Sequence, residues 1–133
     1  MQTIFNNPSI YFNLKEKTQR NQKCFTPYIS IDGVETEDFA NASGGIVNVL
    51  SFLLRVVILS ISSNRRFIIL DEAFNNLSIE YRANVSEFLK LLADRLNMQF
   101  FIVSHTTELN AAADKLYEIT KKDGFVKFTE IKQ

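Results

Sequence analysis

Two adjacent carboxylates, Asp71 and Glu72, directly follow four apolar residues at 67–70. An unbroken apolar run is typical of a strand that is buried on both faces, and the carboxyl end of such a strand is where an α/β sheet meets its ligand. At that end, Asp71 could hold Mg²⁺ through its water shell, and Glu72 could orient or deprotonate the attacking water in nucleotide hydrolysis. The competing interpretation is a strand that ends in two solvated acids.

A second apolar run, 100–103, leads through Ser104 to His105, which is the chain's only histidine. A neutral imidazole at the edge of a nucleotide site can hydrogen-bond the γ-phosphate and the attacking water. A lone histidine is more often structural, but the position of His105 after a buried strand favours a functional role. Zinc binding is excluded, because one histidine and one cysteine are too few ligands.

Upstream, Ser43-Gly44-Gly45 precedes a long apolar run, 46–61. Two glycines at the head of a helix leave backbone N–H groups open to an approaching anion, and the helix dipole adds about half a positive charge there. The Ser43 hydroxyl can donate a further hydrogen bond. These residues therefore predict a phosphate cradle that contains no lysine, and the alternative is a glycine-rich turn before a buried helix.

The elements that position these residues follow from hydrophobic periodicity and turn residues. The first eight residues are expected to be peripheral. Strands are predicted at 9–18 and 25–31 as an antiparallel hairpin, with Pro27 favouring an edge position and Asp32-Gly33 forming a turn. Residues 35–42 then form an acidic connector.

Helices and strands alternate in the rest of the chain. A helix from Ser43 to Ile61 is apolar around nearly its whole circumference, which predicts burial on most sides. Ser78 can cap the next helix, whose apolar stripe has spacings of three and four: Tyr81, Val85, Phe88, Leu89, Leu92 and Leu96. The other predicted elements are strands at 67–70 and 99–103, a short helix at 108–113, and a closing hairpin of strands 116–120 and 125–131 around Lys122-Asp123-Gly124.

Composition limits the possible functions. The chain has 133 residues, enough for one domain with a real core, and 15 basic and 15 acidic residues, which give no support for a strong electrostatic grip on DNA by this chain alone. The single Cys24 excludes an internal disulfide and suits a reducing cytoplasm. The apolar run 46–61 is shorter than the ~20 residues that span a bilayer and has Arg55 in its middle, so a membrane helix is not expected.

Taken in order, these motifs resemble the C-terminal half of an ABC-type ATPase head. More narrowly, the chain resembles the SMC-like DNA-repair and recombination ATPases of the SbcC type, including those of phages, over about residues 28 to 119. Four motifs carry the resemblance: Ser43-Gly44-Gly45 as the signature motif, Asp71-Glu72 as the Walker B motif, Phe74-Asn75-Asn76-Leu77-Ser78 as the D-loop, and His105 as the switch histidine.

The resemblance implies an α/β fold, a mostly parallel sheet with flanking helices and antiparallel hairpins near both ends. It implies a single domain over 1–133, with N-terminal strands in 1–34 and the motif-bearing core in 43–119. ATP and Mg²⁺ are the implied cofactors. Asp71 would hold Mg²⁺ through water, and Glu72 and His105 would be the catalytic residues.

The resemblance also implies partners. The residues of the signature motif would contact the γ-phosphate of ATP bound to the opposite subunit of a head-to-head dimer, and the D-loop residues Asn75, Asn76 and Ser78 would lie against their twins. An SbcD-type nuclease and DNA would be reached through the complex. The sequence departs from the common pattern at Ser78, where an acidic residue is usual, and at Ala42 and Ile46, which flank the signature motif.

One essential part of an ATP site is not found in the sequence. None of the four glycines fits the phosphate-binding pattern G-x-x-x-x-G-K-[ST]. The chain is therefore expected to be catalytically silent alone and to need a P-loop-bearing half, either as the second half of a split ATPase or as a portion of a longer chain. The alternative is a stand-alone half-ATPase that docks on another ATPase and regulates or inhibits it. Each of these predicts apolar surface that a partner must cover.

Overall fold

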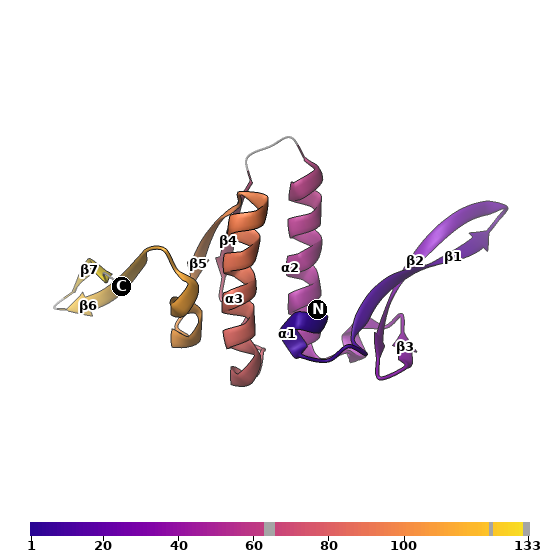
Figure 1. Ribbon diagram of the computed structural model, residues 1–133, viewed down its shortest axis with the longest axis horizontal. Coiled ribbons are helices and arrows are strands. Elements are labelled where there is room, and N and C mark those ends of the chain that lie inside the picture. The colour runs from indigo at the N-terminus through magenta and orange to yellow at the C-terminus, as the bar shows by residue number, and fades with distance from the viewer. Residues whose placement is uncertain (63–65, 123, 132–133) are drawn as a thin grey trace.

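The computed structural model describes residues 1–62, 66–122 and 124–131, with two long helices at its centre and a β-hairpin at each side (Figure 1). The elements are α1 (Gln2–Phe5), β1 (Tyr11–Gln19), β2 (Gln22–Ile31), β3 (Val34–Thr36), the 3₁₀ turn η1 (Phe39–Asn41), α2 (Gly44–Ile61), β4 (Phe67–Asp71), α3 (Ile79–Leu96), β5 (Gln99–Val103), the 3₁₀ helix η2 (Thr107–Ala112), β6 (Leu116–Lys122) and β7 (Phe125–Ile131).

The core lies between the two long helices and one side of the sheet formed by β4 and β5. Ile68 and Leu70 of β4 are buried, and Phe52 of α2 makes edge-on or tilted ring contacts with Phe74 at 5.5 Å and Phe100 at 6.0 Å between centroids. The predicted stripe of α3 is confirmed, because its six residues are buried or packed against this core. The core therefore fixes β4 and β5, whose carboxyl ends carry the candidate site residues.

The sheet differs from the mostly parallel one that the sequence predicts. In the described part of the chain, β4 and β5 form the one parallel pair, while β1–β2–β3 and β6–β7 are antiparallel. A parallel sheet is normally covered on both faces, and α2 and α3 cover one face here. The other face is apolar and exposed, and we call it the outer face; it consists of Phe67, Ile69, Phe101 and Val103.

Helix α2 is not buried on most sides, contrary to the sequence prediction. Gly45, Ile46, Val49, Leu50, Phe52 and Val56 are buried along it, but its C-terminal half exposes Leu54, Val57, Ile58 and Ile61. By length and composition alone α2 would qualify as a membrane span, a test that core helices also pass. One apolar side of α2, which the sequence predicts to be core, is therefore left uncovered by this chain.

The N-terminal sheet is built from two tight hairpins. Arg20 and Asn21 join β1 to β2 with φ of 49° and 64°, and the predicted Asp32-Gly33 turn joins β2 to β3 with φ of 50° and 83°, values that fit type I′ turns. β2 is the central strand in the order of this sheet, but at Pro27 itself the predicted edge position is confirmed. Proline is tolerated because β3 pairs only with residues 29–31, which leaves the second side of Pro27 unpaired.

The first eight residues are part of the core rather than peripheral. Ile4 and Phe5 of α1 are buried, the Phe5 and Tyr81 rings lie 5.2 Å apart, and the Asn84 side-chain amide donates to the Ile4 carbonyl at 2.8 Å. A single helical turn in a polar context gives little sequence signal. Its position is set by packing against α3, which periodicity within residues 1–8 cannot reveal.

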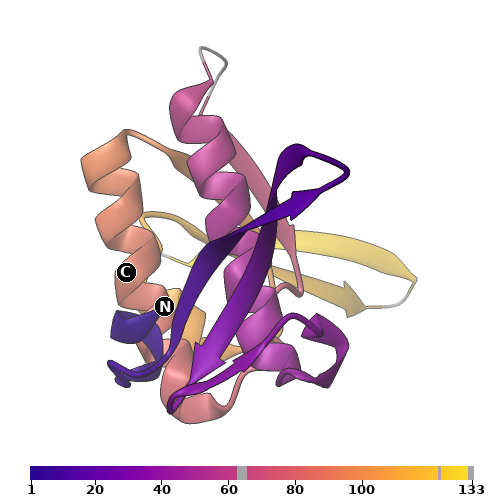
Figure 2. The ribbon, with the colours of Figure 1, turned by 90° about the vertical axis from the view of Figure 1, so that its right-hand side faces the viewer.

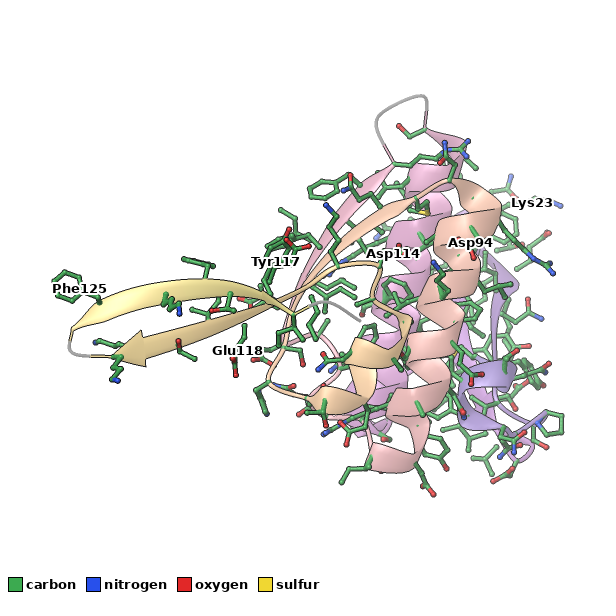
Figure 3. All side chains as sticks on the ribbon, turned by 60° about the vertical axis from the view of Figure 1, so that its left-hand side comes forward. Lys23, Asp94, Asp114, Tyr117, Glu118 and Phe125 are labelled. Carbon is green, nitrogen blue, oxygen red and sulfur yellow. The ribbon has the colours of Figure 1, made fainter. Side chains whose placement is uncertain are left out.

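The C-terminal segment confirms the closing hairpin and revises the short helix. Residues 107–112 form a 3₁₀ helix, which the buried Ser86 hydroxyl ties to α3 by donating to Leu109 O and accepting from Ala112 N, both at 3.2 Å. The hairpin β6–β7 extends away from the helices, with Phe125 near its tip (Figure 3). Asp123 of the predicted turn lies outside the described residues.

Candidate functional site

The acid pair lies where the sequence predicts, at the carboxyl end of β4. Asp71 is the last residue of the strand and is exposed, and the Glu72 N–H donates to the Val103 carbonyl at 2.9 Å, which extends the pairing with β5 by one bond. Glu72 has φ of 48°, a left-handed conformation that is rare for a residue other than glycine. Backbone strain of this kind is concentrated at functional sites.

Glu72 and His105 contact each other although they are far apart in the sequence. His105 Nδ1 lies 3.0 Å from Glu72 Oε1, because β4 and β5 are parallel neighbours whose carboxyl ends meet at one edge. The His105 imidazole lowers the pKa of Glu72 from its usual value of 4.5, the Asn75 side chain acts in the same direction, and partial burial opposes both. Glu72 is therefore held as a carboxylate.

The second carboxylate oxygen of Glu72 has the properties of a ligand-binding atom. Oε2 is buried and has no hydrogen-bond partner among the described residues. A buried acceptor without a donor is costly, so the site suits a water molecule or another donor at that position. No group of three or more metal-ligating side chains occurs in the described ranges, so Mg²⁺ would need water and phosphate oxygens in addition to Asp71.

Beside the acid pair is a hollow of about 330 Å³, which the sequence analysis missed. One wall is a polar stripe on α2, formed by Asn48, Ser51 and Arg55, and the other includes Asp71 and Glu72. The spacing of three and four on an otherwise apolar helix was the available signal. The stripe places Arg55 among the residues that line the hollow together with Asp71 and Glu72.

The predicted phosphate cradle lies at the N-terminus of α2 and packs on the predicted D-loop. Ser43 is the N-cap residue, but its side chain makes no capping hydrogen bond. Gly44 is exposed and Gly45 is buried. A Cβ atom on Gly45 would lie 3.0 Å from Leu77 Cδ1 and 3.1 Å from Asn76 O, whereas one on Gly44 would come no closer than 3.7 Å to Asn76. An added methyl group would therefore crowd its neighbours at Gly45 but not at Gly44.

This difference predicts opposite outcomes for two matched substitutions. Gly45→Ala should destabilise the chain by about 1–3 kcal/mol, because backbone Asn76 O must move to admit the new methyl group. Gly44→Ala should change stability by less than about 0.5 kcal/mol, as at other exposed positions. Urea unfolding of both variants measures this, and equal effects would contradict the packing explanation.

The D-loop residues Asn75 and Asn76 are brought to the other motifs, and a residue that the sequence analysis missed holds them. Arg82 of α3 donates from Nε to Leu77 O at 2.9 Å and from Nη2 to Asn75 O at 3.1 Å. Ser78 is the N-cap of α3, and its carbonyl accepts from Tyr81 N at 2.9 Å without a side-chain cap. The sequence signal that could have identified Arg82 was its position one helical turn after the N-cap residue Ser78.

The contact between His105 and Glu72 can be tested by titration. His105→Ala should raise the pKa of Glu72 towards 4.5, because the largest cause of its lowering is removed. In the native chain the contribution of Glu72 to stability is present above that value and is lost as pH falls through the lowered pKa. Carboxyl ¹³C NMR measures the shift. Glu37, whose pKa is lowered by Lys17, is the control and should not change; a Glu72 titration that the variant leaves unaltered would contradict the prediction.

Comparison with known proteins identifies the fold. The sequence matches no protein-family model and no curated protein. Among solved structures, it matches one described under the structural biochemistry of ATP-driven dimerization and DNA-stimulated activation of SMC ATPases, with TM-score 0.75, 16% identity, and coverage of 98% of this chain and 78% of that one.

Two further matches are SMC head domains of known source. One is the Smc head domain with an extended coiled coil from Pyrococcus furiosus, bound to the C-terminal domain of ScpA, with TM-score 0.76, 16% identity, and coverage of 98% and 32%. The other is the SMC head domain from Thermotoga maritima, with TM-score 0.66, 18% identity, and coverage of 99% and 44%. The chain has the fold of part of an SMC ATPase head and spans less than half the length of these two structures.

Proposed function

We propose that this chain is the C-terminal nucleotide-binding lobe of an SMC-type ATPase of the SbcC class, which acts with a P-loop-bearing half. The observation that carries the proposal is the Glu72–His105 contact at the carboxyl ends of two parallel strands, with Glu72 Oε2 buried and without a hydrogen-bond partner among the described residues. This is the arrangement that a hydrolytic site needs to hold one water molecule in line with a phosphoryl group.

The side chains would divide the work as follows. Glu72 orients the attacking water through Oε2 and accepts its proton, and His105 fixes the carboxylate through Oε1 while its other ring nitrogen faces the γ-phosphate. Asp71 would hold Mg²⁺ through water, and the bound metal would neutralise charge on the phosphates. Substrate binding by the P-loop is the contribution that this chain lacks.

The outer face of β4–β5 supports the need for a second half. Ile69 and Phe101 are 61% and 55% exposed in the middle of two strands whose other side is core. A parallel sheet that is apolar on both faces is stable when both are covered. The P-loop half would cover this face and bring its nucleotide to the carboxyl ends of the strands.

The N-terminus of α2 supports the second part of the proposal, a head-to-head dimer around ATP. The Ser43 hydroxyl makes no capping hydrogen bond, and the Gly44 residue is exposed. Both the hydroxyl and the Gly44 N–H can donate to an anion that approaches along the helix axis. In the proposed complex that anion is the γ-phosphate on the opposite head. Control of DNA processing in recombination or repair, with an SbcD-type nuclease in the cytoplasm, is the role we assign to such a complex.

The same outer face would serve the alternative function, a stand-alone half that docks on the P-loop half of another ATPase and inhibits it. Here the acid pair would be carried but not used. Purified chain should be assayed for Mg²⁺-ATP binding and hydrolysis with and without a P-loop polypeptide encoded beside it. Silence alone and activity on mixing supports the ATPase; tight association with an ATPase that it slows supports the regulator.

A further inference from the structure

Arg82 occupies an unusual position for a charged residue on the surface of a helix. It lies in the first turns of α3, is half-buried, and turns its guanidinium back to the preceding loop, where Nε and Nη2 donate to the carbonyls of Leu77 and Asn75. A guanidinium can serve two carbonyls at once because its donors form a rigid fork, which the single ammonium of lysine cannot reproduce.

Arg82 holds residues 75–77. This segment contacts both the predicted phosphate cradle at the N-terminus of α2 and the acid pair Asp71-Glu72. On one side, Asn76 O and Leu77 Cδ1 border Gly45 so closely that an added Cβ would lie 3.1 and 3.0 Å from them. On the other side, the Asn75 N–H donates to the Glu72 carbonyl at 3.3 Å. The N-termini of α2 and α3 lie at the same end of the molecule, with this segment leading into α3 (Figure 1, Figure 2).

Few backbone bonds fix this segment by themselves. Besides the Asn75 bond, Leu77 N–H donates to Phe74 O at 3.0 Å. The carbonyls of Asn75 and Leu77 both accept from Arg82, so a change at Arg82 frees two acceptors in a segment that has no regular secondary structure. Any shift of the segment would move Asn76 O, which borders Gly45.

We propose that Arg82 is a positioning residue that holds residues 75–77 so that the N-terminus of α2 and the acid pair keep a fixed spacing. The consequence for catalysis rests on the proposed ATPase function. In that dimer, the N-terminus of α2 would face the ATP bound to the opposite head, and Glu72 would face the ATP bound to the same head as itself. The spacing would then couple the two nucleotides of the dimer. The positioning itself requires no nucleotide.

The test uses the ¹⁵N-labelled full chain in three variants: Arg82→Lys, Arg82→Gln and the control Arg95→Lys, which makes the same exchange near the other end of α3. The backbone amide resonances of Gly45 and Glu72 should both shift in the Arg82 variants, more in Gln than in Lys, and neither should shift in Arg95→Lys. In the complemented ATPase, Arg82→Lys should lower kcat by about tenfold and change KM for ATP by less than about twofold.

A folded Arg82 variant in which the Gly45 and Glu72 amides stay in place, or in which only one moves, would overturn the proposal. The native chain provides a measurement that does not depend on variants folding. The Arg82 Nε–H should exchange with solvent more slowly than that of Arg95, and equal rates would also overturn it. If the amide resonances shift but mixing with the P-loop half gives no ATP hydrolysis, the proposed function is wrong and the positioning role of Arg82 is supported. If ATP is hydrolysed but the amide resonances do not shift, the positioning role is wrong and the proposed function is supported.

Discussion

Glu72→Gln should abolish ATP hydrolysis by the complemented ATPase and leave ATP binding intact. The amide has nearly the shape of the carboxylate and can keep a hydrogen bond to His105, but it cannot accept a proton from water. The expected loss in kcat is about 10²–10⁴-fold, the usual contribution of a positioned general base. Because nucleotide would stay bound, the variant should accumulate closed dimers. Single-turnover hydrolysis and size-exclusion chromatography with Mg²⁺-ATP measure the two effects.

The control is Glu80→Gln, which makes the same exchange at an exposed residue in the first turn of α3. It should hydrolyse ATP at the native rate, which would show that the effect belongs to position 72 rather than to lost charge near the site. Turnover by Glu72→Gln within tenfold of the native rate would contradict the assignment of Glu72 as base. Association with the P-loop half should be unaffected in both variants.

Ile69→Lys should prevent association with the P-loop half without unfolding the chain. Ile69 is 61% exposed on the outer face, so lysine keeps its charge in water in the free chain. In the complex the ammonium would be buried among Phe67, Phe101 and Val103, where an unpaired charge is strongly unfavourable. We expect affinity to fall at least about 100-fold, as at other interface positions where truncation or charge is severe. Isothermal titration calorimetry measures it.

Leu91→Lys is the matched control, because Leu91 is 41% exposed on α3, whose packed side faces the other surface of the sheet. It should bind the P-loop half as the native chain does. The free Ile69→Lys chain should keep its thermal unfolding midpoint and aggregate less. Undiminished affinity of Ile69→Lys would show that the outer face is not the interface, and the docking of a P-loop half on this face, which both proposals include, would then be wrong.

The sequence predicted the chemical groups of the candidate site better than their surroundings. Strands 67–71 and 99–103 were recognisable because their apolar runs are too short for a helix and rich in β-branched and aromatic residues. Once both are parallel, the meeting of Glu72 with His105 follows from the geometry of the sheet. The roles of these residues remain predictions, as do the domain boundaries within 1–133.

What the sequence could not provide are contacts that depend on tertiary packing. The two bonds of Arg82 run backwards from a helix to a loop, and no periodic pattern encodes them. The burial of Ile4 depends on α3, which is distant in the sequence. The whole circumference of α2 was predicted to be core, yet Leu54, Val57, Ile58 and Ile61 are exposed and need a neighbour that this chain does not supply. Hydrophobicity indicates that a surface will be covered, but not by which chain.

The left-handed backbone of Glu72 has a consequence for how this position would change under selection. An L-residue with a side chain costs roughly 1–2 kcal/mol in that conformation, and glycine or asparagine adopts it more easily. Selection for folding stability alone should therefore replace Glu72 by glycine or asparagine. If Glu72 is the proposed base, relatives that hydrolyse ATP should carry glutamate here against the local conformational preference, and a lineage that had lost the need for hydrolysis should drift towards glycine or asparagine.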